Sequence, residues 1–256
     1  MHISGRSSAN ETFMEFFMMK KDVEYSKVMG RLKALSDPRM AEARARWAGV
    51  RAHTILGLSI PSVRKIAKET GRSHVLAQEL WLSGVHEARL VACMIDDPEL
   101  VSEEQLERWV GDFDSWDVCD HCCSNLFDKT AFAYQKAVEW SGREEEYVRR
   151  AGYTMMATLA VHDKRAGDDV FLRFLPIIER GSTDERNFVK KAVNWALRQI
   201  GKRNKSLNVA AIRTAEVISR FDSRAARWVA SDALRELRSP MVQSRLNSRR
   251  MSGRRK

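Results

Sequence analysis

The chain has 256 residues and a formal net charge of +10 at pH 7, with 44% hydrophobic and 30% charged residues. No apolar run approaches the roughly 18 residues that a membrane span needs, and the apolar stretch "FMEFFMMKK" is not followed by a secretory cleavage site. The composition therefore predicts a soluble globular protein, and the positive charge favours an anionic partner.

Much of the charge lies at the carboxyl end. The last residues contain six cations and no acid, and the rest of the chain carries +4 once these six are subtracted from +10. We therefore expect 241–256 to be a basic, disordered tail that adds nonspecific affinity for DNA. The six are Arg245, Arg249, Arg250, Arg254, Arg255 and Lys256.

Helical periodicity runs through the whole chain, and no alternating strand pattern occurs. Pro38, Pro61, Pro98 and Pro240 stand where helices could begin, whereas Pro176 should kink or break its helix. In chain order we expect helices at 10–35, 38–48, 61–70, 73–83, 86–95, 102–111, 114–127, 129–140, 144–162, 167–179, 184–203, 206–220, 223–237 and 240–247.

The short helices from residue 60 onward form pairs of about 35–45 residues, a period typical of HEAT-type repeats. This spacing predicts an all-α fold, a curved solenoid of HEAT-like repeats with a concave basic face along which function would lie. We expect a single domain over 1–240, in which the N-terminal helices (10–48) precede the repeats.

The segment "DERNFVKKAVNWALRQIGKRNK" predicts an amphipathic helix. One narrow stripe is apolar, and the opposite side places Trp195 among cations. The first interpretation is a solvated basic face with Trp195 in a lateral packing contact; the second is a surface for a polyanion, with an indole against sugar, base or lesion. The helix alone leaves both open. The stripe contains Val189, Val193, Ala196 and Ile200, and the basic side contains Lys191, Arg198 and Lys202.

The segment "DSWDVCDHCC" puts Trp116 and Asp120 one turn apart on one side of a helix. Asp120 is flanked by this indole and by apolar groups, so its carboxylate is partly desolvated and needs a partner to stay charged. Asp117 and His121 point elsewhere, as solvent or capping residues. Asp120 is either a buried salt-bridge acid in helix packing or a catalytic carboxylate.

The cysteines of this segment do not predict a metal or redox centre. Cys119, Cys122, Cys123 and His121 are too close together on one helix to form a tetrahedron, and no second ligand pair follows. The spacing also lacks the β-α-β context of a redox pair. We expect reduced thiols that serve as small core residues and hold no metal.

Two further basic segments contain candidate contacts for an anionic partner. Arg149 and Arg150 run into the apolar stretch "AGYTMMATLAV", so an arginine there is either a boundary residue or the partner of a buried anion. Arg64 lies in "GLSIPSVRKIAKETG" with Lys65 and Lys68 near one helix face, which ordinary solvated side chains also explain.

Five segments in this order and spacing resemble the DNA alkylation repair proteins of the AlkD type, the HEAT-like-repeat alkylpurine DNA glycosylases. They are "GLSIPSVRKIAKE", "HEARLVA", "SWDVCD", "YVRRAGY" and "FVKKAVNWALRQIGKRN". The resemblance covers about residues 25–240. It implies an all-helical solenoid that clasps duplex DNA on a basic concave face and acts on N3- and N7-alkylated purines without metal or cofactor.

The resemblance also implies roles for four residues. Trp116 and Asp120 match the family's W-D-x-x-D motif, whose last aspartate stabilises an oxocarbenium-like sugar and positions water. Arg150 matches an arginine that holds a backbone phosphate, and Trp195 matches a second tryptophan at the deoxyribose. Lys191, Arg198, Lys202, Arg149 and Arg64 are then the expected DNA-binding cations.

Part of the sequence departs from the family. The stretch "ARARWAGVRAHTILGLSIP" matches the N-terminal DNA contact only loosely, although Trp47 and Arg51 could substitute. Three hypotheses remain: a monofunctional glycosylase for cationic alkylpurines, a non-catalytic binder of damaged or branched DNA, and a HEAT-type protein-interaction scaffold. The first leads to the expectation of a monomer without an obligate protein partner, acting on duplex DNA in a bacterial-type cytoplasm at the nucleoid.

Overall fold

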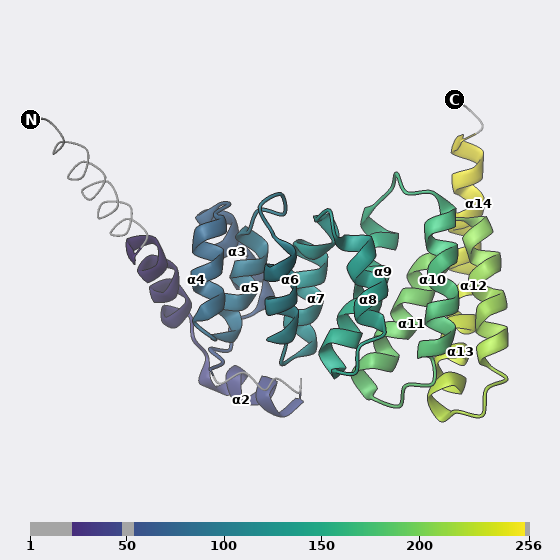
Figure 1. The fold of residues 1–256 in the computed structure, drawn as a ribbon, viewed down its shortest axis with the longest axis horizontal. Coiled ribbons are helices and arrows are strands. Elements are labelled where there is room, and N and C mark those ends of the chain that lie inside the picture. Colours follow the sequence, from purple (N-terminus) through teal and green to yellow (C-terminus); the bar gives the residue numbers. More distant parts are fainter. Residues whose placement is uncertain (1–21, 48–53, 254–256) are drawn as a thin grey trace, which may run out of the picture. The chain divides into compact units, whose positions relative to one another are not determined.

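The computed structural model describes residues 22–47 and 54–253 (Figure 1). Every regular element in these residues is a helix, and the one extended pairing found there is an isolated bridge between Thr54 and Val85. This confirms the all-α prediction. The chain divides into two compact units, Met1–Leu100 and Val101–Lys256.

The first unit contains a helix at 22–34 and four named helices. α5 packs against both α3 and α4. Its buried Glu87 accepts the backbone N–H groups of Leu56, Gly57 and Leu58 at 2.7–3.2 Å, which fixes the segment that leads into α3. The named helices are α2 (Pro38–Trp47), α3 (Ile60–Thr70), α4 (His74–Leu82) and α5 (His86–Ile95).

The second unit is built from two rows of helices. α7, α9, α11 and α13 pack successively in one row, and α8, α10 and α12 pack successively in the other (Figure 1). Its elements are α6 (Glu103–Gly111), α7 (Trp116–Asn125), the 3₁₀ helix η1 (Phe127–Lys129), α8 (Ala133–Ser141), α9 (Glu146–His162), α10 (Asp168–Gly181), α11 (Asn187–Gly201), α12 (Lys205–Ile218), α13 (Arg224–Leu237) and α14 (Pro240–Gly253).

The core between the two rows uses the apolar stripe expected of α11. The four stripe residues are fully buried, and burial of side chains of this kind is worth about 1.5–3 kcal/mol each for the larger ones. Asn194 Nδ2 adds a hydrogen bond of 3.1 Å to the Val229 carbonyl, which connects α11 to α13. The stripe contains Val189, Val193, Ala196 and Ile200.

Two local expectations were wrong in part. A kink or a break was expected at Pro176, and α10 continues through this residue without a break. Pro176 is exposed, so the carbonyl that loses its helical partner can be hydrated. α14 is helical over Pro240–Gly253. The helix expected at 240–247 is therefore present, and the disorder expected of 241–256 is wrong for the part of this segment that the structure describes. Val242 and Leu246 of α14 are buried, so this helix has an apolar contact that its basic composition conceals.

Several expectations lie outside the described residues. These are the helix over 10–21, the end of the next helix at residue 48, Arg51, and the last three tail residues. The single domain over 1–240 stays a prediction. No helix in 22–47 or 54–253 is long and apolar enough to cross a membrane.

Candidate active site and nucleic-acid interface

Asp120 lies on α7 and is held by two residues of α9. Arg150 donates from Nε to Oδ1 at 2.9 Å and from Nη2 to Oδ2 at 2.7 Å, a bidentate pair. Thr154, one turn after Arg150, donates its hydroxyl to Oδ1 at 3.2 Å. The sequence predicted that this carboxylate needs a partner, and the structure shows that the partner is Arg150.

Arg150 is buried, and each of its three guanidinium nitrogens donates a hydrogen bond to a group of the protein. Besides the two bonds to Asp120, Nη1 donates to the Phe188 carbonyl at 2.5 Å, at the start of α11. Its side chain is 7% exposed. Burial is the largest single influence and lowers the pKa of Arg150, but the charge and hydrogen bonds of Asp120 raise it above its ordinary value. These bonds use three of the five N–H donors of the guanidinium, and the contact with a backbone phosphate that the resemblance implies stays a prediction.

Asp120 keeps one open position. A carboxylate offers about four lone pairs; Oδ1 uses both of its own on Arg150 and Thr154, whereas Oδ2 accepts only from Arg150. The Asp120 side chain is 20% exposed, so Oδ2 can reach solvent or a ligand. Trp116, one turn earlier as the first residue of α7, is 36% exposed beside it.

The thiols of α7 set its position against α9. Cys119 Sγ lies 3.7 Å from the Tyr147 carbonyl, and Cys123 Sγ lies 3.8 Å from the Ala151 carbonyl. Cys119 and Cys123 are four residues apart on α7, and their partners Tyr147 and Ala151 are four residues apart on α9 in the same order. The two helices therefore run parallel, and Asp120 lies opposite Arg150. Burial raises the pKa of the Cys123 thiol well above its usual value. The prediction of buried core cysteines is confirmed.

Of the residues flanking Asp120, Asp117 is buried rather than solvent-facing, and its Oδ1 accepts from the Val118 N–H at 3.0 Å. His121 Nδ1 lies 3.4 Å from Asn125 Nδ2. Among the described residues, no three His, Cys, Asp or Glu side chains are grouped so that they could hold a metal ion.

The expected basic side of α11 is partly neutralised. Arg198 and Lys202 both bond Glu236 of α13, Lys202 at 2.5 Å, and Arg198 lies 3.6 Å from Asp232. Burial would raise the pKa of Glu236, but these two cations lower it below its usual value. Lys191 is exposed.

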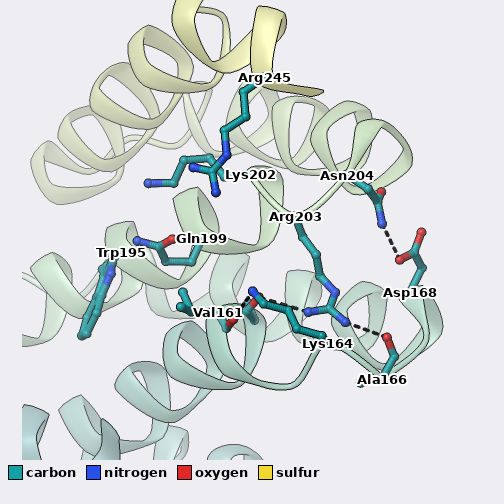
Figure 2. A pocket seen from close by; sticks show the side chains of 11 residues that line it. Val161, Lys164, Ala166, Asp168, Trp195, Gln199, Lys202, Arg203, Asn204 and Arg245 are labelled. Carbon is teal, nitrogen blue, oxygen red and sulfur yellow. Dashed lines mark hydrogen bonds between the residues drawn. The ribbon is translucent and has the colours of Figure 1, made fainter. Parts of the chain in front are cut away.

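Trp195 lines a pocket of about 700 Å³ formed by the carboxyl ends of α9 and α11 and by α14 (Figure 2). Four cations also line it, against the single acid Asp168, which accepts a bond of 2.7 Å from Asn204. The prediction that Trp195 lies among cations is confirmed, although Lys164, Arg203 and Arg245 had not been predicted there. The four cations are Lys164, Lys202, Arg203 and Arg245.

The pocket and the Asp120–Arg150 pair lie at opposite ends of α9 and α11. The start of α11 is bonded to the start of α9, since Arg186 donates to the Glu144 carbonyl and Phe188 accepts from Arg150. Beyond the end of α11, Arg203 donates to the carbonyl of Ala160 near the end of α9, so the two helices are parallel. Phe188 and Trp195 are seven residues apart, which is about 10 Å along a helix. The structure thus brings Asp120 and Arg150 into direct contact and places Trp195 about two turns further along.

The two remaining predicted cations differ in setting. Arg149 donates to the Arg143 carbonyl at 2.6 Å and to Asp184 at 3.1 Å, and it lines a separate small pocket of about 210 Å³ with Arg180. It therefore supports the turn before α9 instead of joining Arg150. Arg64 is exposed on α3 in the first unit.

Thr154 is the contact to Asp120 that the sequence analysis missed. It follows Arg150 by four residues in "RRAGYT", so helical spacing alone would have placed both on one face of α9. The bond to Phe188, in contrast, uses a backbone carbonyl that carries no sequence signal.

With this geometry in hand, comparison with known proteins gives the class of protein. The family model of DNA alkylation repair enzymes matches residues 28–237. A solved structure described as a new family of proteins related to the HEAT-like repeat DNA glycosylases with affinity for branched DNA structures aligns with a TM-score of 0.70 at 20% identity, covering 87% of this chain and 95% of that one. At this identity the likeness shows the fold.

A structure of an engineered protein aligns with a TM-score of 0.41 at 14% identity, covering 84% of this chain and 98% of that one. No curated protein sequence matches at the significance required. Because the family model spans most of its length, the chain belongs to the DNA alkylation repair enzyme family. The expected family and the HEAT-like-repeat fold are thereby confirmed.

Proposed function

We propose that this protein is a monofunctional DNA glycosylase that hydrolyses the N-glycosidic bond of cationic N3- and N7-alkylated purines in duplex DNA. The observation that carries the proposal is Asp120, a carboxylate fixed by Arg150 and Thr154, with one lone pair of Oδ2 left open and an exposed indole one turn away.

The chemistry needs negative charge at a fixed place. An alkylated purine already carries positive charge and leaves readily, so acid catalysis at the base is of little use. As the bond breaks, positive charge develops on the sugar, and a carboxylate held in position before reaction stabilises it without reorganisation. The open lone pair of Asp120 Oδ2 serves this purpose, or orients the attacking water.

Arg150 acts in this proposal as a positioning residue. Its positive charge compensates the negative charge of a mostly buried carboxylate, and its two parallel hydrogen bonds fix the orientation of that carboxylate. The anchor to Phe188 also connects the pair to α11, the helix that carries Trp195. Trp116 and Trp195 would contact the deoxyribose, with a cation–π attraction to the developing charge.

Release of base from a duplex containing 7-methylguanine tests the proposal. Wild-type protein in excess over DNA should release free 7-methylguanine and leave an abasic site, which alkali then cleaves. Intact glycosidic bonds after prolonged incubation would sink the glycosylase proposal.

The second candidate function is binding of branched DNA without catalysis. It is favoured by the structural neighbour that is described as having affinity for branched DNA structures. It predicts tighter binding to a four-way junction than to a linear duplex of equal length, with no abasic product from either. Base release together with equal affinity for the two forms would reject it.

A further inference from the structure

The pocket beside Trp195 has a charge that its own residues do not neutralise. Lys202 is paired with Glu236, and Asp168 is the one acid among the lining residues. Arg245 is exposed and forms no ion pair with any residue in the described part of the chain. Its guanidinium is therefore the cation most available to a ligand.

Two other cations of the pocket, Arg203 and Lys164, form hydrogen bonds with backbone carbonyls of the protein. Arg203 donates to the carbonyls of Ala160 and Ala166 at 3.1 and 2.7 Å, and its guanidinium lies 4.3 Å from the centre of the Phe171 ring. Lys164 donates to the Val161 carbonyl. These bonds neutralise the negative carboxyl end of α9, but both cations still raise the positive potential of the pocket (Figure 2).

α14 holds Arg245 in place over the pocket. Val242 and Leu246 on either side of it are buried, and Gln243 Nε2 donates to the Leu237 carbonyl at 2.7 Å and to Asn208 Oδ1 at 3.1 Å. In Figure 2 the Arg245 side chain extends from α14 toward Lys202. α14 follows the family-matched part of the chain, which ends at residue 237.

The sign of the charge decides which part of DNA this pocket can take. The substrate base of the proposed reaction is itself a cation, so a pocket lined by four cations repels it. A phosphodiester is attracted, and an arginine fork and an ammonium group match its oxygens. The Trp195 indole adds a flat wall against which a sugar can pack.

We propose that Arg245 of α14, with Lys202, forms a phosphate-binding subsite for the DNA backbone, at the opposite end of α9 and α11 from Asp120. This inference rests on the proposed DNA binding but not on the glycosylase reaction. The helix after the family-matched region thus extends the DNA-binding surface and leaves the reacting sugar to Asp120.

Fluorescence anisotropy with a fluorescein-labelled undamaged duplex tests the subsite through Arg245→Gln. Each phosphate contact contributes about 0.9 to the slope of log affinity against log salt concentration. The R245Q variant should therefore lose about 0.9 of that slope, and its affinity at low salt should fall about twofold to fivefold, as for one exposed charge pair. Arg245→Lys should restore most of both.

The matched control is Arg213→Gln. Arg213 is an exposed arginine on α12, in the other row of helices, and it forms no ion pair with the described residues. The control removes the same charge and should leave the salt slope unchanged. Equal slopes for R245Q and wild type, or equal losses for R245Q and R213Q, would overturn the subsite.

Base release separates this proposal from the proposed function. With protein in saturating excess, wild type and the R213Q control should release 7-methylguanine at the same rate, which reports the glycosylase reaction independently of the salt slope. A salt-slope loss in R245Q with no base release by wild type overturns the glycosylase and keeps the subsite. Base release with an unchanged slope overturns the subsite alone.

Discussion

Asp120 and Arg150 form the buried charge pair on which the proposed chemistry depends. Trp116 and Asp120 could be placed on one helix face from their spacing alone. Their spacing could not say whether the carboxylate was structural or catalytic, because its partner lies 30 residues further along the chain. Arg150 was a candidate for that partner, and the structure assigns it.

Arg150→Lys isolates the positioning role of the bidentate pair. Lysine keeps the positive charge but offers a single ammonium group, so it cannot hold both oxygens of Asp120 and also reach the Phe188 carbonyl. We expect the single-turnover rate of base release to fall about tenfold, because the loss of one hydrogen bond worth roughly 1.4 kcal/mol raises the barrier by that amount. DNA affinity should stay within about twofold of wild type. A variant that loses affinity and retains its rate would instead mean that Arg150 binds DNA.

The helix elements were largely predictable because apolar residues recur at helical spacing along the chain, and α3, α4, α6, α12 and α13 also begin at a Ser or Asn side-chain cap. Their ends were less so. The helix expected at 114–127 is α7 followed by the short η1, and α8 begins at Ala133 rather than at 129. Helix ends depend on individual local hydrogen bonds, such as the one that the Thr130 hydroxyl donates to the Phe127 carbonyl at 2.8 Å, and hydrophobic periodicity does not report them.

α8 and α9 approach closely at Gly152. A Cβ built there would lie 2.3 Å from the Ser141 nitrogen, a contact with backbone that cannot move aside. We expect Gly152→Ala to lower the free energy of unfolding by about 1–3 kcal/mol, measured by urea denaturation.

Gly142→Ala is the matched control for Gly152→Ala. Its Cβ would meet the Glu139 carbonyl oxygen at 3.5 Å, an ordinary contact, and its φ of −90° suits any residue. We expect a change within about 0.5 kcal/mol. Similar losses in the two variants would contradict close packing as the cause.

Asp184 connects the turn before α11 to α9. It accepts from Arg149 at 3.1 Å and from Arg186 at 2.6 and 2.9 Å, and its side chain is 7% exposed. Burial would raise the pKa of Asp184, but the bonds from Arg186 and Arg149 lower it below its usual value. The folded chain therefore binds fewer protons here than the unfolded chain at mildly acidic pH.

Asp184→Asn should accordingly show a loss of stability that depends on pH. The contribution of Asp184 is full above the unfolded pKa of about 3.9 and is lost as pH falls through the lower folded pKa. We expect a cost of about 2 kcal/mol at pH 7 that shrinks below pH 4, in urea denaturation across this range. A difference that stays constant or grows on acidification would contradict the ion-pair account.

At the scale of the whole molecule, the sequence predicted the all-α class and the family, since periodicity and motif spacing extend over most of the chain. It did not predict the division into two compact units near residue 100. It predicted a helix over 240–247 but assigned 241–256 as a whole to a disordered tail. The composition of this segment is dominated by its charge, whereas its packing depends on the two buried apolar residues Val242 and Leu246. Three of the five expected DNA-binding cations, Arg149, Arg198 and Lys202, form bonds within the protein, which a count of charges cannot reveal.

The central claim is that Asp120 stabilises the sugar cation during loss of an alkylated purine. Its most direct test is the single-turnover release of 7-methylguanine from duplex DNA by wild type and by Asp120→Asn, both in saturating excess. Asparagine keeps the shape and removes the charge, so the rate should fall about 100-fold or more with DNA affinity unchanged. Equal rates for the two proteins, or no release by wild type, would contradict the account.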